Sequence, residues 1–243
     1  MKIVFVLLIQ FLLHSQTELV FLKTPTVSVV TEIEEAIIEN IIHLYNLKSE
    51  KKFTYRIERV STFTDIFKRL DKKEPYLVAI NSISVTSSRK LKYDFSSSYL
   101  PSKEVIISLK LLPASVDWKT KNSKIAYQEK TTQEIVFNRL QKKYGLIGLP
   151  YGNLGSRYIA LSNKVANFTI ADNVEVWNDK RFKIVTILSE QLSDGFALCY
   201  PKGSVLQQKL NKFIKYYINS AKFYKLIEEK YGKEVRDYFK RNL

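Results

Sequence analysis

Apolar positions recur along the chain with two different periods, and the alternation of these periods predicts alternating strands and helices. In the first half, β-branched and apolar runs predict strands over 26–32, 52–60 and 76–80. Runs with apolar residues three and four positions apart predict helices over 31–47 and 61–73. Because parallel strands need crossover helices, the βαβαβ order predicts an α/β domain with helices on both faces of its sheet.

The second half of the chain repeats this order. Its apolar runs predict strands over 123–128, 165–173, 183–190 and 195–203, and helices over 131–145, 204–220 and 221–239. Two helix starts carry a Thr followed three positions later by a Glu, Thr31 with Glu34 and Thr131 with Glu134, which is the spacing of a capping box. Gly145 is expected to stop the helix that Thr131 begins.

The N-terminus, MKIVFVLLIQFLLHSQ, has one Lys, an apolar run and a polar exit, which is the layout of a secretory signal peptide. The run from Ile3 to Leu13 is short for a membrane-spanning helix, which needs about 20 apolar residues. We therefore expect residues 1–16 to be a signal peptide and the mature protein to be periplasmic. The alternative is a buried first strand or helix. No Cys follows the run, so no lipid anchor is expected there.

Composition narrows the classes of function. A chain of 243 residues that is 45% hydrophobic and 26% charged suits one large globular domain or two small lobes. With one Cys and two His residues, neither a thiolate cluster nor a histidine-built metal site is expected, and no cofactor is predicted. The single Cys199 follows apolar neighbours and is expected to be a buried thiol.

The net charge of +15 would suit a nucleic-acid partner, because basic proteins neutralise phosphates. The basic residues are mostly Lys, however, and they are spread along the chain without a nucleic-acid recognition motif. We therefore predict no nucleic-acid partner. The charge still favours attraction of anionic ligands or surfaces.

Small hydroxyl side chains gather around one guanidinium between residues 81 and 100, in NSISVTSSRKLKYDFSSSYL. The stretch starts where the predicted strand 76–80 ends, and ligands of open α/β sheets bind at the carboxyl ends of strands. The guanidinium of Arg89 suits a carboxylate, and the hydroxyls can complete the shell of a small polar ligand. The alternative is a surface Arg in a Ser-rich loop.

Two further places carry binding chemistry. Thr131 and Thr132 stand at the predicted N-terminus of the helix over 131–145, where backbone amides attract anions. The alternative is an ordinary N-cap. Asp172 ends the apolar strand over 165–173, where a carboxylate needs a partner such as an ammonium group, or else forms a turn. Together with Arg89, these groups offer two devices for a carboxylate and one for an ammonium, which suits an α-amino acid.

These motifs resemble those of the family 3 periplasmic solute-binding proteins, the receptors of polar amino-acid ABC transporters. The stretch SVTSSRKLKYDFSSSY, residues 84–99, is similar to the family pattern S-I-T-x-x-R-x-x-x-x-D-F-S-x-x-Y. IAYQEKTTQE resembles the family's second-lobe strand and Gly-Thr-Thr turn, and LSNKVANFTIAD resembles its strand ending in Asp. The resemblance extends over residues 25–235.

The resemblance implies a two-lobed α/β fold of the type II periplasmic-binding-protein class, with a helix-flanked sheet in each lobe. Lobe 1 would comprise residues 17–110 and 196–243, and lobe 2 residues 111–195, with crossing strands near 105–110 and 195–200. It also implies a monomer without enzyme activity that captures an amino-acid-like ligand for ABC-type uptake, with an inner-membrane permease as its partner.

The resemblance also implies roles for single residues. Arg89 would bind the α-carboxylate of the ligand and Asp172 its ammonium group. Further ligand contacts are implied for six residues, Phe63, Asn81, Ser82, Ser84, Thr131 and Thr132. The chain also departs from the family pattern: Lys130 replaces the Gly before the Thr pair, Leu77 and Ala166 replace Asp residues, and the family's aromatic stretch after the first strand has no counterpart.

Two other functions stay open from the sequence. One is an enzyme on the same fold, like the cyclohexadienyl dehydratases that resemble this family, although no acid and base pair stands out in the cleft. The other is a sensory or cell-wall-fragment receptor, which the positive charge would suit.

Overall fold

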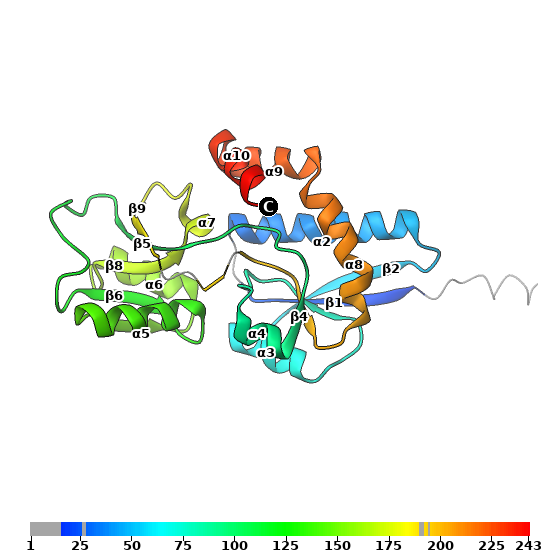
Figure 1. Cartoon of the computed structure of the whole chain (residues 1–243), viewed down its shortest axis with the longest axis horizontal. Helices are drawn as coiled ribbons and strands as arrows, with labels where there is room; N and C mark the ends of the chain where they lie inside the picture. Colours follow the sequence, from blue (N-terminus) through cyan, green and yellow to red (C-terminus); the bar gives the residue numbers. More distant parts are fainter. Residues whose placement is uncertain (1–15, 26–27, 190–191, 194) are drawn as a thin grey trace, which may run out of the picture.

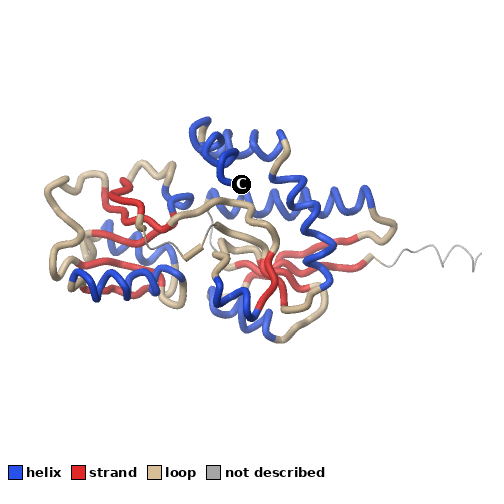
Figure 2. Tube along the Cα trace, viewed as in Figure 1, coloured by secondary structure: helices blue, strands red, loops and turns tan. Residues whose placement is uncertain are grey.

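The chain forms two lobes, each built on a five-stranded sheet with helices on its faces (Figures 1 and 2). The structure is a computed structural model that describes residues 16–25, 28–189, 192–193 and 195–243. It confirms the predicted α/β class and the predicted two-lobed arrangement. The chain leaves the first lobe after its fourth strand and returns to it with its tenth.

The first sheet has the strand order β2-β1-β3-β10-β4, in which β1 runs parallel to both of its neighbours and β10 runs antiparallel to both of its own. Its strands are β1 (Thr17–Lys23), β2 (Phe53–Arg59), β3 (Leu77–Ala79), β4 (Tyr93–Phe95) and β10 (Cys199–Pro201). The helices of this lobe are α2 (Val29–Lys48), α3 (Phe63–Asp71), α4 (Ser87–Lys92), α8 (Val205–Ile218), α9 (Ala221–Tyr231) and α10 (Lys233–Asn242). Figure 1 shows α2 and α8 to α10 on one side of the sheet and α3 and α4 on the other.

The second sheet has the order β7-β6-β8-β5-β9, with β6 parallel to both neighbours and β5 antiparallel to both of its own. Its strands are β5 (Glu104–Leu109), β6 (Lys124–Gln128), β7 (Ile147–Tyr151), β8 (Phe168–Asp172) and β9 (Phe182–Ile187). Its helices are α5 (Thr132–Tyr144), α6 (Leu154–Ser162) and α7 (Asn173–Val176). Separate buried clusters lie beneath α5 and α6, so both faces of this sheet are covered.

The first strand differs from the prediction. It is β1, whereas the predicted strand over 26–32 is wrong: residues from Val29 onward belong to α2, and 26–27 lie outside the described residues. Ser28 is the N-cap of α2, and its hydroxyl accepts from the backbone N–H of Thr31 at 3.2 Å. The predicted capping box of Thr31 and Glu34 is therefore wrong. The β-branched residues Val29 and Val30 form the first turn of α2, where the side chain of Val30 is buried in the core.

The boundary between the lobes also differs from the prediction. The crossing was expected at 105–110, but β5 pairs with β8 and β9, so these residues belong to the second sheet. Residues 104–108 are all buried, and a strand buried on both faces needs neighbours on both edges and helices above and below. The predicted signal peptide, residues 1–16, lies outside the described residues except for Gln16.

The C-terminal region contains one helix more than predicted. The expected helix over 221–239 is divided at Gly232, whose φ of 91° is a conformation that suits glycine, so α9 ends before it and α10 starts after it. Cys199 is fully buried, as predicted. Within the described residues, no helix is both long and apolar enough to cross a bilayer.

Candidate functional site

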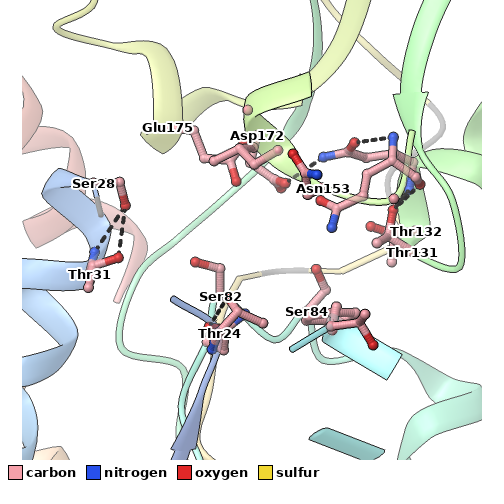
Figure 3. Close-up of a pocket in the computed structure, with 18 of the residues that line it drawn as sticks. Thr24, Ser28, Thr31, Ser82, Ser84, Thr131, Thr132, Asn153, Asp172 and Glu175 are labelled. Atoms are coloured by element: carbon pink, nitrogen blue, oxygen red, sulfur yellow. Dashed lines mark hydrogen bonds between the residues drawn. The ribbon is translucent and has the colours of Figure 1, made fainter. Parts of the chain in front are cut away.

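A cleft of about 400 Å³ lies between the lobes and is lined by residues of both. All eight predicted site residues line it, five from the first lobe and three from the second: Phe63, Asn81, Ser82, Ser84, Arg89, Thr131, Thr132 and Asp172. Figure 3 shows Asp172 facing Ser82 across the cleft, with Thr131 and Thr132 to one side. We call the first-lobe lining the first wall and the second-lobe lining the second wall.

Arg89 stands in the first wall, in the short helix α4 that follows β3 along the chain. Thr86 caps this helix by accepting from the backbone N–H of Arg89 at 3.2 Å. The half-buried guanidinium donates to the carbonyl of Ser84 at 2.9 Å and lies over the rings of Phe63 and Phe67, at 5.4 and 5.0 Å. Burial lowers the pKa of Arg89, yet no carboxylate forms an ion pair with it among the residues that the structure describes.

The residues that follow β3 are hydrogen-bonded to the segment after β1 and to α2. The Oδ1 atom of Asn81 accepts from the backbone N–H and the hydroxyl of Thr24, at 2.8 and 2.9 Å. Ser82 has a φ of 49°, an uncommon conformation for a residue with a side chain. Its N–H donates to the Oε1 atom of Glu34 at 2.5 Å, which holds the turn in place. These hydrogen bonds tie the turn at the carboxyl end of β3 to the segment after β1 and to α2.

Sequence reasoning missed the buried ion pair in this wall. The Nζ atom of Lys23 lies 2.7 Å from the Oε2 atom of Glu34, and both side chains are at most 2% exposed. The hydroxyl of Tyr99 also donates to Glu34, at 2.5 Å. One signal was present in the sequence: Glu34 lies one turn before Ile38 and one residue after Ile33, on the apolar stripe of its helix.

In the second wall, Thr131 is the N-cap of α5. Its hydroxyl accepts from the N–H of Gln133 at 3.2 Å and donates to the carbonyl of Gln128 at 2.7 Å. Glu134 accepts from the N–H of Lys130 at 2.7 Å, so the predicted capping box is shifted by one residue. Lys130, which stands where the family pattern has Gly, has a φ of 59°, a left-handed conformation that glycine adopts without strain. Thr132 is buried in the cleft lining.

Asp172 ends β8 with its side chain buried, which decides against a role in a surface turn. Its carboxyl group accepts from the hydroxyl of Ser102 at 2.9 Å and from the amide of Gln133 at 3.2 Å. Burial, helped by the nearby carboxylates of Glu175 and Glu104, raises the pKa of Asp172 to about 8. Glu104 is its cross-strand neighbour, and burial raises the pKa of that carboxyl as well.

A second buried network, also missed by sequence reasoning, supports Asp172. The side chain of Arg157 in α6 is fully buried and donates to Gln133, to the carbonyl of Ile170 and, at 2.8 Å, to Glu175. Gln133 thus accepts from Arg157 and donates to Asp172. No periodicity pointed to Arg157, because a single Arg in a helix ordinarily faces solvent.

Taken together, the cleft can hold a small ligand that carries both charges. The first wall offers a guanidinium that forms no ion pair with any residue the structure describes, and the second wall offers a carboxyl group that an ammonium would ionise. Hydroxyl and amide groups make up most of the remaining lining. The described part of the chain contains no group of His, Cys, Asp and Glu residues suited to a metal ion.

Comparisons with known proteins fit this description. Residues 44–234 match the model of the bacterial extracellular solute-binding proteins, family 3. A solved ancestral arginine-binding protein bound to arginine is 19% identical, with a TM-score of 0.69 over 90% of this chain and 100% of that chain. A Salmonella typhimurium periplasmic binding protein with high arginine specificity is 16% identical, with a TM-score of 0.71 over 88% and 99%.

A third solved structure is an ancestral amino acid-binding protein that preceded cyclohexadienyl dehydratase. It is 16% identical, with a TM-score of 0.68 over 88% of this chain and 95% of that chain. At these identities the likeness shows the fold. No curated protein matches the chain in sequence.

Proposed function

Because the chain belongs to the family 3 bacterial extracellular solute-binding proteins, we propose that it captures a polar amino acid or a similar zwitterion between its lobes. One observation carries the proposal: Arg89 and Asp172 line a single cleft from opposite lobes. The guanidinium takes the α-carboxylate through two parallel hydrogen bonds, and Asp172 takes the ammonium group. Thr132 and Ser84 complete the shell around the carboxylate.

Binding closes the lobes over the ligand. Only a closed form contacts the ligand with Arg89 and Asp172 together, so the ligand binds that form more tightly and shifts the population toward it. Removal of water from the cleft strengthens both charged contacts. This is the behaviour required of a receptor that presents its ligand to a membrane transporter.

We further propose export and delivery to a transporter. Residues 1–16 direct the chain out of the cytoplasm, and the mature monomer delivers its ligand to an ABC-type permease. N-terminal sequencing of the exported protein tests the first step, since a chain that retains Met1 would contradict it. Loss of uptake of the bound amino acid in a deletion strain, restored by the wild-type chain, tests the second.

An enzymatic function is the second candidate, favoured by one observation. A carboxyl group with a pKa near 8 is suited to donate a proton, as the acid of a dehydratase must. The ancestral relative of cyclohexadienyl dehydratase has the same fold. Incubation of the purified protein with prephenate and arogenate separates the two functions, because a binding protein leaves both compounds unchanged.

The proposed function is tested by a thermal-shift screen of the twenty amino acids, followed by calorimetry. A ligand that binds only the folded state raises the melting temperature with its concentration. We expect at least one polar amino acid to do so, and Arg89→Ala to abolish the shift. Muropeptides in the same screen test the cell-wall receptor, and binding of these alone would overturn the proposal.

A further inference from the structure

Two buried carboxyl groups lie next to each other in the second lobe, and one of them lines the cleft. Glu104 is the cross-strand partner of Asp172, where β5 pairs antiparallel with β8. Directly opposite residues place their side chains on the same face of a sheet, with Cβ atoms about 4.5–5.5 Å apart. Both residues are buried, with 1% of Glu104 and 7% of Asp172 exposed. Among the described residues, Asp172 belongs to the cleft lining and Glu104 does not.

The surroundings of the two carboxyl groups favour ionisation of Glu104 before Asp172. Burial raises the pKa of Glu104, whereas three donors lower it by stabilising the carboxylate: its own backbone N–H, the hydroxyl of Thr132 and the backbone N–H of Leu192. For Asp172, burial acts together with two negative neighbours, Glu175 and Glu104, and raises the pKa to about 8. Glu104 therefore carries a charge while Asp172 still holds its proton.

The other charged group of like sign near Asp172 has its own cation. Figure 3 shows Glu175 beside Asp172, and the buried guanidinium of Arg157 pairs with Glu175 at 2.8 Å. Arg157 also lowers the pKa of Asp172, so this pair acts on Asp172 with both signs. The groups that act on Glu104 are neutral donors. The titratable groups that influence Asp172 from the surrounding elements are Glu104, Arg157, Tyr158, Glu175 and, across the cleft, Arg89.

From this arrangement we propose that Glu104 is a positioning residue for ligand binding: its buried charge keeps a proton on Asp172 in the ligand-free cleft, and the ammonium group of the ligand displaces that proton into solvent. The inference rests on the proposed function and deepens it. Each binding event releases one proton, because Asp172 exchanges its O–H bond for a charged contact with the ammonium and no other bond changes. Capture of the amino acid therefore weakens in acid, where the proton stays on Asp172.

Calorimetry in buffers of different ionisation enthalpy tests the inference on the wild-type protein, because it counts the protons released on binding. The probe is the one of the twenty amino acids that raises the melting temperature most. At pH 7 most of one proton should be released per bound amino acid, since a group with a pKa of about 8 is about nine-tenths protonated there. Binding without proton release overturns the inference and leaves the proposed function intact. Binding of none of the twenty amino acids overturns both.

Glu104→Gln tests the residue, because it removes the charge and nearly keeps the shape of the side chain. If the pKa of Asp172 falls by about one unit, proton release at pH 7 should fall to about half a proton, and the ratio of the affinities at pH 8 and pH 6 should fall about fivefold. Glu104→Met gives the same readings if Glu104→Gln fails to fold. Glu229→Gln, at an exposed position of α9, is the matched control and should behave like wild type. A folded Glu104 variant with the proton release and pH profile of wild type would overturn the assignment to Glu104.

Discussion

The two walls of the cleft each contain a buried ion pair, but the pairs are connected to the binding groups differently. The pair of Lys23 and Glu34 in the first wall contacts the backbone of Ser82 and the hydroxyl of Tyr99, whereas Arg89 bonds to the carbonyl of Ser84. The pair of Arg157 and Glu175 in the second wall is linked through Gln133 to Asp172. In the first wall the ion pair is therefore separate from Arg89, whereas in the second wall it is bonded through Gln133 to Asp172.

This difference sets the protonation of the two binding groups. Arg89 keeps its charge at every physiological pH and is held by a carbonyl and two aromatic rings. Asp172 lies among like charges, Glu104 and Glu175, which together with burial raise its pKa to about 8. On the proposed function, the first wall is therefore ready for a carboxylate, whereas Asp172 would have to release a proton before it could hold an ammonium.

The largest expected effect comes from breaking the network of the second wall. Arg157→Met removes the cation from a fully buried site and leaves Glu175 unpaired, which costs about 3–5 kcal/mol in the free energy of unfolding. Urea denaturation measures it. Arg181→Met is the control, since its exposed pair with Asp179 should contribute under about 1 kcal/mol. Equal losses in the two variants would contradict the network.

The next effect removes the binding cation of the first wall. Arg89→Ala should weaken ligand binding by about 2–5 kcal/mol, or about 30- to 4000-fold, because a charged contact is lost from a closed cleft. Arg89→Lys should not restore binding, since an ammonium cannot form two parallel hydrogen bonds. Both variants should fold, as a circular dichroism melt would show. Calorimetry that found wild-type affinity in either variant would mean that the carboxylate binds elsewhere.

A smaller effect is the pH dependence of ligand affinity and of stability that the proton on Asp172 causes. An ammonium needs the ionised carboxylate, so affinity should rise about tenfold per pH unit up to about pH 8. In the ligand-free protein the same raised pKa makes the free energy of unfolding fall between about pH 4 and 8, because the folded state keeps a proton that the unfolded state has released. Calorimetry and denaturation at several pH values measure both trends.

Asp172→Asn provides the control for this pH dependence. The amide does not titrate, so both the rise in affinity and the fall in stability should disappear in the variant. Its affinity should be low at every pH, because the ammonium has lost its charged partner. A wild-type protein with flat affinity from pH 6 to 8 would place the ammonium on another group.

The smallest expected effect shows whether the hydroxyl of Thr131 only caps α5 or also contacts the ligand. The hydroxyl of Thr131 is engaged as the N-cap of α5, so Thr131→Ala should cost about 1 kcal/mol of stability and change ligand affinity less than about threefold. Ser28→Ala, which removes the N-cap of α2 in the first wall, is the matched comparison. A loss of affinity above tenfold in Thr131→Ala would make this hydroxyl a direct ligand contact.

The sequence by itself determined the α/β class, the two-lobed fold through its family resemblance, and eight of the residues that line the cleft. Alternating periods located most strands and helices, because apolar spacing reflects which face of an element is buried. The motif around Arg89 and the strand end at Asp172 identified residues that the fold then brought into one cleft. Periodicity and short motifs involve residues that are close in sequence, so they can be recognised without knowing which helices and strands pack together.

Tertiary structure alone decided which charges are paired. Lys23 and Glu34 are separated by 11 positions, and Arg157 and Glu175 by 18, and neither pair is visible as a motif. Residues 104–109 form a strand of the second sheet because they pair with β8 on one side and with β9 on the other. The sequence spacing suggested that Glu34 belongs to a capping box, but in the structure it pairs with Lys23. The pairing of a buried charge depends on neighbours that are distant in sequence, so it could not be predicted from local spacing.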